Sequence, residues 1–246
     1  MPSNQDMRSK VIIALDVENK EQALALVREL KEARIFKVGL ELFTAEGPPL
    51  VKELGRLGKS VFLDLKLHDI PNTVAEAVRI GVRLGAAMMT IHTSGGEGMM
   101  RKAAETASAE SEKTKTVRPL LLGVTILTSL KSDDLQAIGM VPDISGQVLR
   151  LAGLAKKSGL DGIVCSAQEI EIARRELGAG FVIVTPGIRP AWAAAQDQKR
   201  IMTPSQAIQM GSDYLVVGRP VTQAASPREA FLKIIEEIEE TQNLSA

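Results

Sequence analysis

Five charged residues lie in or directly after short apolar runs in the first third of the sequence. They are Asp16, Lys37, Asp64, Lys66 and Asp69. Side chains of a strand alternate between its two faces, so Asp64 and Lys66 are predicted to share one face while the intervening leucines point to the other. Fixed ammonium and carboxylate groups can stabilise charge that develops during a reaction, because solvent need not reorganise around it.

The alternative is an ion-pair network that only fills the fold. Buried charges are costly unless they are paired, and an apolar plug is usually at least as stable as an ionic one. An alternating array of acids and bases is therefore better explained by catalysis, and we predict that these five residues belong to an active site.

A second group of residues, near the C-terminal end, could bind phosphate. Arg189 follows an apolar run that ends in Thr185-Pro186-Gly187, and Gly218 and Arg219 follow the last apolar run. A glycine lets the backbone approach an anion closely, and a guanidinium can bind two phosphate oxygens at once. The alternative is a surface turn with solvated arginines. The presence of both arginines, with a long segment after Arg189, favours the phosphate site.

Two histidines and one cysteine are the remaining reactive side chains. His68 and His92 follow predicted strand ends, where we interpret them as hydrogen-bonded structural imidazoles. Cys165 is the only cysteine, so it cannot form an intramolecular disulfide, and we predict a buried strand residue. No cysteine and histidine cluster has the spacing of zinc ligands, so the sequence predicts no metal site.

The elements that position these residues follow from the hydrophobic pattern. Eight short apolar runs alternate with amphipathic stretches, a pattern typical of βα units on a parallel sheet. The runs are 11–17, 35–40, 60–66, 86–92, 119–126, 162–165, 181–186 and 213–218. Such units can close into a (β/α)8 TIM barrel or form an open doubly wound sheet.

The length of the chain favours the barrel. The 246 residues are close to the ~250 typical of a (β/α)8 barrel. No G-x-G-x-x-G motif follows the first run, as it would in a dinucleotide-binding sheet. We therefore predict a single TIM-barrel domain over residues 1–246, with residues 1–10 as a short polar N-terminal extension.

The sequence also indicates where several helices begin. A side-chain oxygen at the N-cap, followed three residues later by Glu or Gln, satisfies two unpaired backbone donors. Four such pairs are Asn19/Gln22, Ser166/Glu169, Thr203/Gln206 and Ser226/Glu229. Two connections, 128–142 and 188–202, are longer than usual, and long loops in compact domains are often functional. The polar stretch 108–116 is predicted to be a solvated connection.

The overall charge excludes several classes of partner. Lys and Arg number 30 and Asp and Glu also number 30, so there is no broad field to attract nucleic acid or anionic lipid. No apolar run approaches the ~18 residues of a membrane span, and the N-terminus has no signal peptide pattern. We expect a cytoplasmic protein without nucleic-acid or membrane partners.

The segment from Asp64 to Thr73, DLKLHDIPNT, resembles the D-x-K-x-x-D-I-P-N-T signature of the orotidine 5′-phosphate decarboxylases of bacterial type. The resemblance covers nearly the whole chain, since segments 14–16, 36–39, 185–190 and 213–220 also match. It implies a carboxy-lyase of pyrimidine biosynthesis that converts orotidine 5′-phosphate to uridine 5′-phosphate without a cofactor.

The resemblance implies a role for each candidate residue. Lys66 would donate a proton to C6 of the pyrimidine as CO2 leaves, and the other catalytic residues would be Lys37, Asp64 and Asp69. The substrate-binding residues would be Asp16, Lys37, Asp64, Asp69, Thr73, Thr128, Arg189, Gln198, Gly218 and Arg219. Asp16 and Lys37 would hold ribose hydroxyls and Thr128 the pyrimidine, whereas the phosphate would be bound by Arg189, Gln198, Gly218 and Arg219.

The resemblance also implies a homodimer. Residues matching Asp69 and Thr73 reach into the neighbouring subunit's site in that family, and the loop at 188–202 closes over the ligand. Here the loop contains Ala191-Trp192-Ala193-Ala194-Ala195-Gln196 where the family is often richer in glycine.

Two other functions are consistent with parts of the pattern. A sugar-phosphate decarboxylase of the keto-gulonate type shares the D-x-K-x-x-D strand but uses its carboxylates to hold magnesium, which Lys37 and Lys66 would repel. A barrel that binds a phosphorylated ligand without chemistry would keep Gly218 and Arg219. The complete charged array argues against that second alternative.

Overall fold

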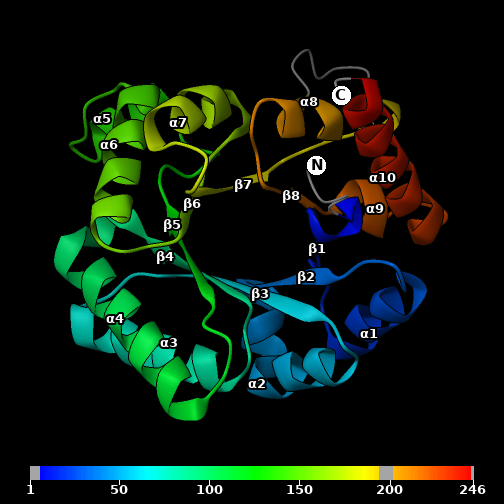
Figure 1. Cartoon of the computed structure of the whole chain (residues 1–246), viewed down its shortest axis with the longest axis horizontal. Coiled ribbons are helices and arrows are strands. Elements are labelled where there is room, and N and C mark those ends of the chain that lie inside the picture. Colours follow the sequence, from blue (N-terminus) through cyan, green and yellow to red (C-terminus); the bar gives the residue numbers. More distant parts are fainter. Residues whose placement is uncertain (1–5, 194–201, 245–246) are drawn as a thin grey trace.

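The computed structural model describes residues 6–193 and 202–244 of the chain. Eight parallel strands close into a barrel in the order β1 to β8, and helices surround it (Figure 1). The first and last strands pair directly, with Val11 opposite Leu215, so the sheet has no free edge. The prediction of a (β/α)8 barrel is confirmed, and the open doubly wound sheet is excluded.

Each of the eight predicted runs coincides with one strand, although β3 extends one residue beyond its run. The strands are β1 Val11–Ala14, β2 Ile35–Gly39, β3 Ser60–Leu67, β4 Met88–His92, β5 Leu120–Val124, β6 Gly162–Val164, β7 Val182–Pro186 and β8 Tyr214–Val217. Several are shorter than predicted. β1 ends at Ala14, so Asp16 lies in the loop that follows it.

The helices lie between the strands. They are α1 Lys20–Glu29, α2 Leu40–Arg56, α3 Pro71–Arg83, α4 Gly96–Thr114, α5 Ser132–Ala137, α6 Ile144–Lys157, α7 Ile170–Leu177, α8 Pro204–Gln209, α9 Arg219–Thr222 and α10 Pro227–Leu244. Short 3-10 helices are η1 Met7–Ser9, η2 Thr93–Gly95, η3 Ala167–Glu169 and η4 Ala191–Ala193.

Most of the predicted helix starts agree with the helices of the structure. The side chains of Asn19 and Thr203 cap α1 and α8, and Thr203 forms a capping box with Gln206. α10 begins directly after Ser226, at Pro227. Ser166 caps η3, so this segment starts as a 3-10 helix before α7.

The prediction of a solvated connection at 108–116 is wrong, because α4 continues through this stretch to Thr114. Glu110 and Ser111 are buried there. An oxygen of Glu110 accepts a hydrogen bond from Nε of Arg83 at 2.7 Å, and Arg79 lies 3.5 Å away. The polar side of α4 therefore packs on α3 through ion pairs, which a hydrophobic pattern does not reveal.

Two apolar clusters build the barrel. The cluster inside it consists of Ile12, Ala14, Ile35, Phe62, Met88, Leu122, Val184 and Val216. The larger cluster fills the space between strands and helices and contains the intervening strand residues, among them Ile13, Phe36 and Leu63. Because inward positions recur every second residue, the next ones after Ala14 and Ile35 are Asp16 and Lys37. The inward face thus changes from apolar to charged toward the C-terminal ends of the strands.

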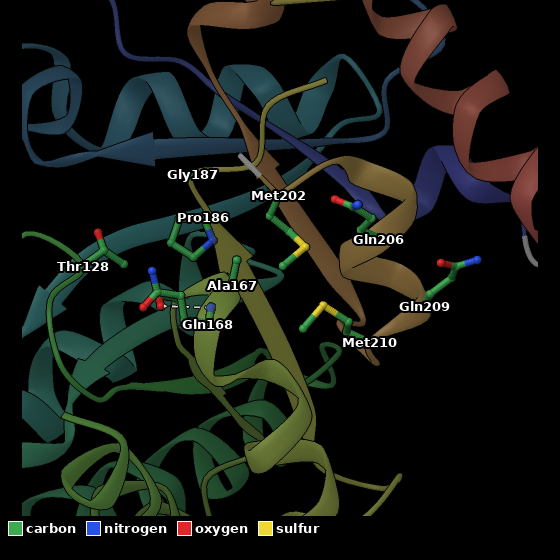
Figure 2. A pocket seen from close by; sticks show the side chains of 10 residues that line it. Thr128, Ala167, Gln168, Pro186, Gly187, Met202, Gln206, Gln209 and Met210 are labelled. Atoms are coloured by element: carbon green, nitrogen blue, oxygen red, sulfur yellow. Dashed lines mark hydrogen bonds between the residues drawn. The ribbon is translucent and has the colours of Figure 1, made fainter. Parts of the chain in front are cut away.

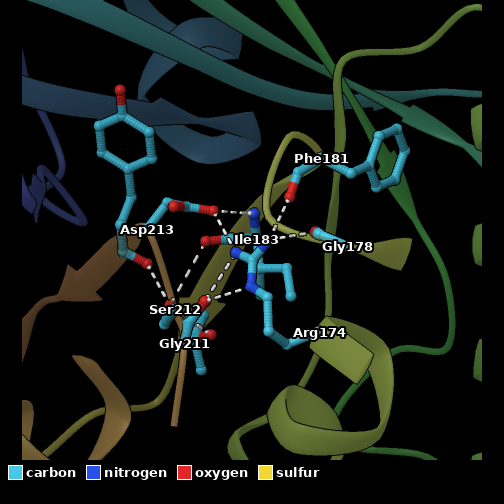
Figure 3. Close-up of polar contacts among 9 residues, drawn as sticks. Arg174, Gly178, Phe181, Ile183, Gly211, Ser212 and Asp213 are labelled. Carbon is cyan, nitrogen blue, oxygen red and sulfur yellow. Dashed lines mark hydrogen bonds and ion pairs between the residues drawn. The ribbon is translucent and has the colours of Figure 1, made fainter. Parts of the chain in front are cut away.

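The N-terminal ends of the strands are tied together by arginine and aspartate pairs. Arg174 of α7 donates to the carbonyl oxygens of Gly178, Phe181 and Gly211 and pairs with Asp213 at 2.6 Å (Figure 3). Asp213 also accepts the backbone N–H of Ile183 in β7 at 2.8 Å.

A second pair of the same kind lies beside β5 and β6. Arg118 binds Asp161 at 2.7 Å, and Asp161 accepts the N–H of Leu121. These contacts fix neighbouring strands at the end of the barrel away from the charged array. None of the helices in the described part of the chain is long and apolar enough to cross a membrane.

Candidate active site

Asp64 is the centre of a chain of charged side chains at the C-terminal ends of β1, β2 and β3. Its Oδ2 lies 2.9 Å from Nζ of Lys66 and 3.7 Å from Nζ of Lys37. Lys37 in turn lies 3.0 Å from Oδ1 of Asp16. The side chains of Asp64 and Lys37 are each 12% exposed, whereas Lys66 is 32% exposed and Asp16 is 59% exposed. The array therefore runs from a buried centre to an open mouth.

Strand β3 brings Asp64 and Lys66 together, although it is not regular. Pairing with β4 joins Leu63 to Met89 and Leu67 to Ile91, so three residues of β3 lie opposite Thr90 alone. Such a bulge bends a strand and redirects its side chains. Lys66 has φ of 50°, a left-handed conformation that is uncommon outside glycine.

The leucines of β3 lie on the other face, as strand alternation predicts. Leu63 belongs to the cluster between strands and helices, and Leu65 and Leu67 pack against it. The two charged residues between them point into the barrel mouth and pair with each other.

Two further residues, Thr90 and Gly39, lie against the array, although the sequence pattern predicted a role for neither. The buried hydroxyl of Thr90 lies 3.0 Å from Oδ1 of Asp64 and 2.8 Å from the backbone nitrogen of Lys66. A Cβ on Gly39 would lie 3.0 Å from Nζ of Lys37. The signal for Thr90 is its position two residues after Met88, which places its side chain on the inward face of β4.

The two histidines lie together beside the array. Their ring centroids are 5.4 Å apart. Burial lowers the pKa of His92, and the charges of His68 and Lys66 lower it further, whereas Asp64 acts in the opposite direction. These surroundings therefore favour the neutral form of His92 at the edge of the charged array.

The single cysteine lies away from solvent. Cys165 is buried, as predicted, and this burial raises the pKa of its thiol to about 12. A thiol in this state is not a nucleophile at neutral pH.

The residues predicted to bind phosphate follow β7 and β8. Gly218 is the N-cap of α9, and a Cβ there would lie 3.6 Å from Oδ2 of Asp16. Arg219 is exposed at the start of α9, and Arg189 is half-buried. The backbone N–H of Arg189 donates to the carbonyl oxygen of Met202 at 3.2 Å, which joins the two ends of the predicted loop.

Gln198, the fourth residue predicted to bind phosphate, lies outside the described residues.

A cavity of about 630 Å³ opens beside β5, β6 and β7. Thr128 lines it on one side, and Gln206, Gln209 and Met210 line it on the other (Figure 2). Its remaining lining residues are Ser166, Ala167, Gln168, Pro186, Gly187 and Met202. The cavity therefore lies between α8 and the segments that follow β5, β6 and β7, and its lining includes Thr128 but no residue of the charged array.

Among the described residues, neither Asp69 nor Thr73 forms a hydrogen bond or an ion pair with Asp16, Lys37, Asp64 or Lys66. Both are exposed, Asp69 in the loop after β3 and Thr73 in the first turn of α3. Oδ1 of Asp69 accepts the N–H of Ile70 at 2.6 Å, and the side chain of Ile70 is 68% exposed. Within the described part of one chain, the ion pairs of the array join Asp16, Lys37, Asp64 and Lys66 but not Asp69.

The described residues contain no group of three or more His, Cys, Asp or Glu side chains placed to bind a metal ion. In the array, ammonium groups separate the carboxylates of Asp16 and Asp64. The donor set is therefore suited to hydrogen bonding and charge stabilisation.

Comparison with known proteins gives one consistent result. A sequence profile described as "Orotidine 5'-phosphate decarboxylase / HUMPS family" matches residues 9–234. The protein named orotidine 5′-phosphate decarboxylase from Syntrophomonas wolfei is 51% identical to this chain, over 95% of this chain and 99% of its own length. The protein of the same name from Vibrio campbellii is 55% identical, over 92% of this chain and 95% of its own length.

A solved structure of the enzyme of that name from Lactobacillus acidophilus is also similar. Its sequence is 39% identical, the match covers 93% of this chain and 98% of that one, and the TM-score is 0.83. The likeness therefore holds for sequence and fold together, over nearly the full length of both chains.

Proposed function

Because the chain belongs to the orotidine 5′-phosphate decarboxylase / HUMPS family and decarboxylates orotidine 5′-phosphate in pyrimidine biosynthesis, we propose that Lys66 protonates the carbon from which CO2 leaves. The observation that carries this proposal is the 2.9 Å contact between Lys66 and Asp64 at the mouth of the barrel.

The chemistry explains why an ammonium group is needed. When the bond between C6 and the carboxylate breaks, its electron pair stays on C6 in the plane of the ring, where the π system cannot delocalise it. An adjacent ammonium stabilises this charge and supplies the proton that forms the new C–H bond. Lys66 then becomes a neutral amine and regains a proton from solvent, which its partly exposed side chain can reach.

Asp64 and Lys37 hold Lys66 in place. Asp64 lies between the two ammonium groups, so each lysine has a carboxylate partner before substrate arrives. We assign Asp16 and Lys37 to the ribose hydroxyls, since their pair lies at the open edge of the array. Charges that are fixed in advance act on the transition state without reorganisation.

The other end of the nucleotide is assigned to the loops after β5, β7 and β8. Thr128 contacts the pyrimidine, and the phosphate is bound by Gly218, Arg219, Arg189 and Gln198. In support, Gly218 lies beside Asp16, and in barrel enzymes phosphate commonly binds after the seventh and eighth strands. Binding energy from the phosphate would then help to orient the reacting ring.

We also propose a homodimer in which Asp69 and Thr73 complete the neighbouring subunit's site. Both residues are exposed and lie outside the array of their own chain, and the exposed Ile70 between them offers an apolar contact. The chain is further assigned as one cytoplasmic domain, in keeping with its family's pathway.

The assay of a lysine variant tests the catalytic proposal. Consumption of orotidine 5′-phosphate is followed by absorbance, with EDTA present, for the parent, Lys66→Ala and the control Lys52→Ala, which replaces an exposed lysine of α2. We expect the parent and control to be active and Lys66→Ala to be about 10⁴-fold slower or worse, the upper range for a general acid.

The alternatives give other outcomes. Loss of parental activity in EDTA would indicate the magnesium-dependent chemistry of the keto-gulonate type. Tight binding of uridine 5′-phosphate without any turnover would indicate a binding protein. Near-normal activity of Lys66→Ala would remove Lys66 as the proton donor.

A further inference from the structure

We propose that Thr90 is a positioning residue for the reaction: its hydroxyl holds the carboxylate of Asp64 and the backbone of Lys66 in the arrangement that catalysis needs. This inference rests on the proposed role of Lys66 and adds a residue on β4 to the site. Thr90 is fully buried, so it acts through Asp64 and Lys66 and does not touch the substrate.

The direction of both hydrogen bonds follows from the groups involved. The backbone N–H of Lys66 can only donate, so the Thr90 hydroxyl accepts at the 2.8 Å contact. A carboxylate can only accept, so the single hydrogen of that hydroxyl is donated to Oδ1 of Asp64 at 3.0 Å. One hydroxyl therefore links the two residues in a fixed donor and acceptor order.

The bond to Asp64 sets which carboxylate oxygen faces the lysines. Oδ1 is held by Thr90, which leaves Oδ2 for Lys66 at 2.9 Å and Lys37 at 3.7 Å. Threonine is branched at Cβ and is stiff about χ1, so its hydroxyl has a defined position in the buried strand. Rotation of the Asp64 carboxylate would break this bond and move the charge away from the ammonium groups.

The bond to Lys66 replaces part of the strand ladder. Because three residues of β3 lie opposite Thr90, the regular pairing between the two strands is interrupted between Leu63 and Leu67. The Thr90 side chain supplies an acceptor for the Lys66 N–H inside this gap. A buried N–H without an acceptor is costly, so the hydroxyl stabilises the left-handed backbone that presents Lys66.

Valine tests this role, because it has nearly the shape of threonine but no hydroxyl. Thr93→Val is a matched control: Thr93 is equally buried, follows the same strand and donates to the carbonyl oxygen of Val124, without contacting the array. We would measure kcat, KM, the Kd of uridine 5′-phosphate and Tm for the parent, Thr90→Val, Thr90→Ser and Thr93→Val.

We expect Thr90→Val to lower kcat about 10- to 100-fold, as expected from the loss of one hydrogen bond to a charged group. The Kd of uridine 5′-phosphate should change by less than about threefold, because the phosphate contacts lie across the barrel. Thr90→Ser, which keeps the hydroxyl, should retain most of the parental kcat. Thr93→Val should keep the parental kcat even if its Tm falls.

Three results would overturn the inference: a parental kcat in Thr90→Val, an equal loss in Thr90→Ser, or an equal loss in Thr93→Val. If Thr90→Val does not fold, the ratio of kcat between Thr90→Ser and Thr90→Ala gives the same test, since both lack the methyl group and differ in the hydroxyl. Lys66→Ala is assayed alongside. Activity in that variant would refute the proton donor itself, whereas an inactive Lys66→Ala with a normal Thr90→Val would refute only the role of Thr90.

Discussion

A Cβ added to Gly39 would lie 3.0 Å from Nζ of Lys37 and 3.7 Å from Oδ1 of Asp16. Gly39 has φ of −91°, which any residue can adopt, so the glycine is required by space and not by backbone conformation. The last residue of β2 thus leaves room for the ammonium group that lies between Asp16 and Asp64.

Gly39→Ala should therefore lower activity without lowering stability. The new methyl group would displace the Lys37 ammonium, and we expect kcat/KM to fall about tenfold or more, since a small shift of a catalytic group is costly. Loss of backbone entropy in the unfolded chain should stabilise the variant by about 0.4–1 kcal/mol. Gly55→Ala, which has open space around its Cβ, is the control for thermal unfolding and kinetics. Unchanged kinetics in Gly39→Ala would show that Lys37 tolerates the crowding.

Arg219→Ala should act mainly on substrate affinity. Arg219 is exposed and makes no contact with the array, so the fold should be retained. Loss of a charge-assisted bond to phosphate is expected to raise KM about 10- to 100-fold, with a smaller change in kcat. Arg56→Ala, at an exposed position of α2, provides the control in steady-state kinetics. An unchanged KM would argue against a phosphate contact at Arg219.

Mixed dimers test the proposed sharing of Asp69. Lys66→Ala and Asp69→Asn should each be inactive alone, because every site of each homodimer lacks one group. In a hybrid dimer one site contains neither change, so equal mixing should restore about a quarter of the parental activity. Subunit exchange is verified with differently tagged chains. If exchange occurs and activity does not return, Asp69 does not serve the neighbouring site.

His92 should make the protein less stable in mild acid. Its pKa is lowered by burial, then by His68 and Lys66, and Asp64 only partly offsets this. The unfolded chain therefore takes up a proton near the ordinary value of 6.5 while the folded protein does not, so stability is present above this pH and is lost as the pH falls below it. Tm measured from pH 8 to pH 5 should fall less steeply in His92→Gln than in the parent or in His68→Gln. Parallel slopes in all three proteins would contradict the assignment.

The sequence was sufficient to predict the barrel and four of the five residues of the charged array, because both follow from the periodicity of residues along the strands. Apolar runs at regular spacing gave the eight strands, and alternation along β3 placed Asp64 and Lys66 on the inward face. α4 could not be predicted in full, since the burial of Glu110 depends on arginines that α3 supplies from an earlier part of the chain.

The supporting residues of the site were harder to predict for a related reason. Thr90 is a single hydroxyl within an apolar strand, and its role depends on the register shift between β3 and β4. The left-handed backbone of Lys66 likewise has no local sequence signal such as a glycine. Such features depend on the register in which two strands pair, and the residue pattern of a single strand does not indicate that register.

The pairs Arg174 with Asp213 and Arg118 with Asp161 fasten the strands at one rim of the barrel, while the charged array and the connection 128–142 lie at the other. The ion pairs that fasten the strands thus share no residue with the ion pairs of the charged array. For protein engineering, this separation means that side chains at the charged rim can be exchanged while the arginine and aspartate pairs at the opposite rim are left in place.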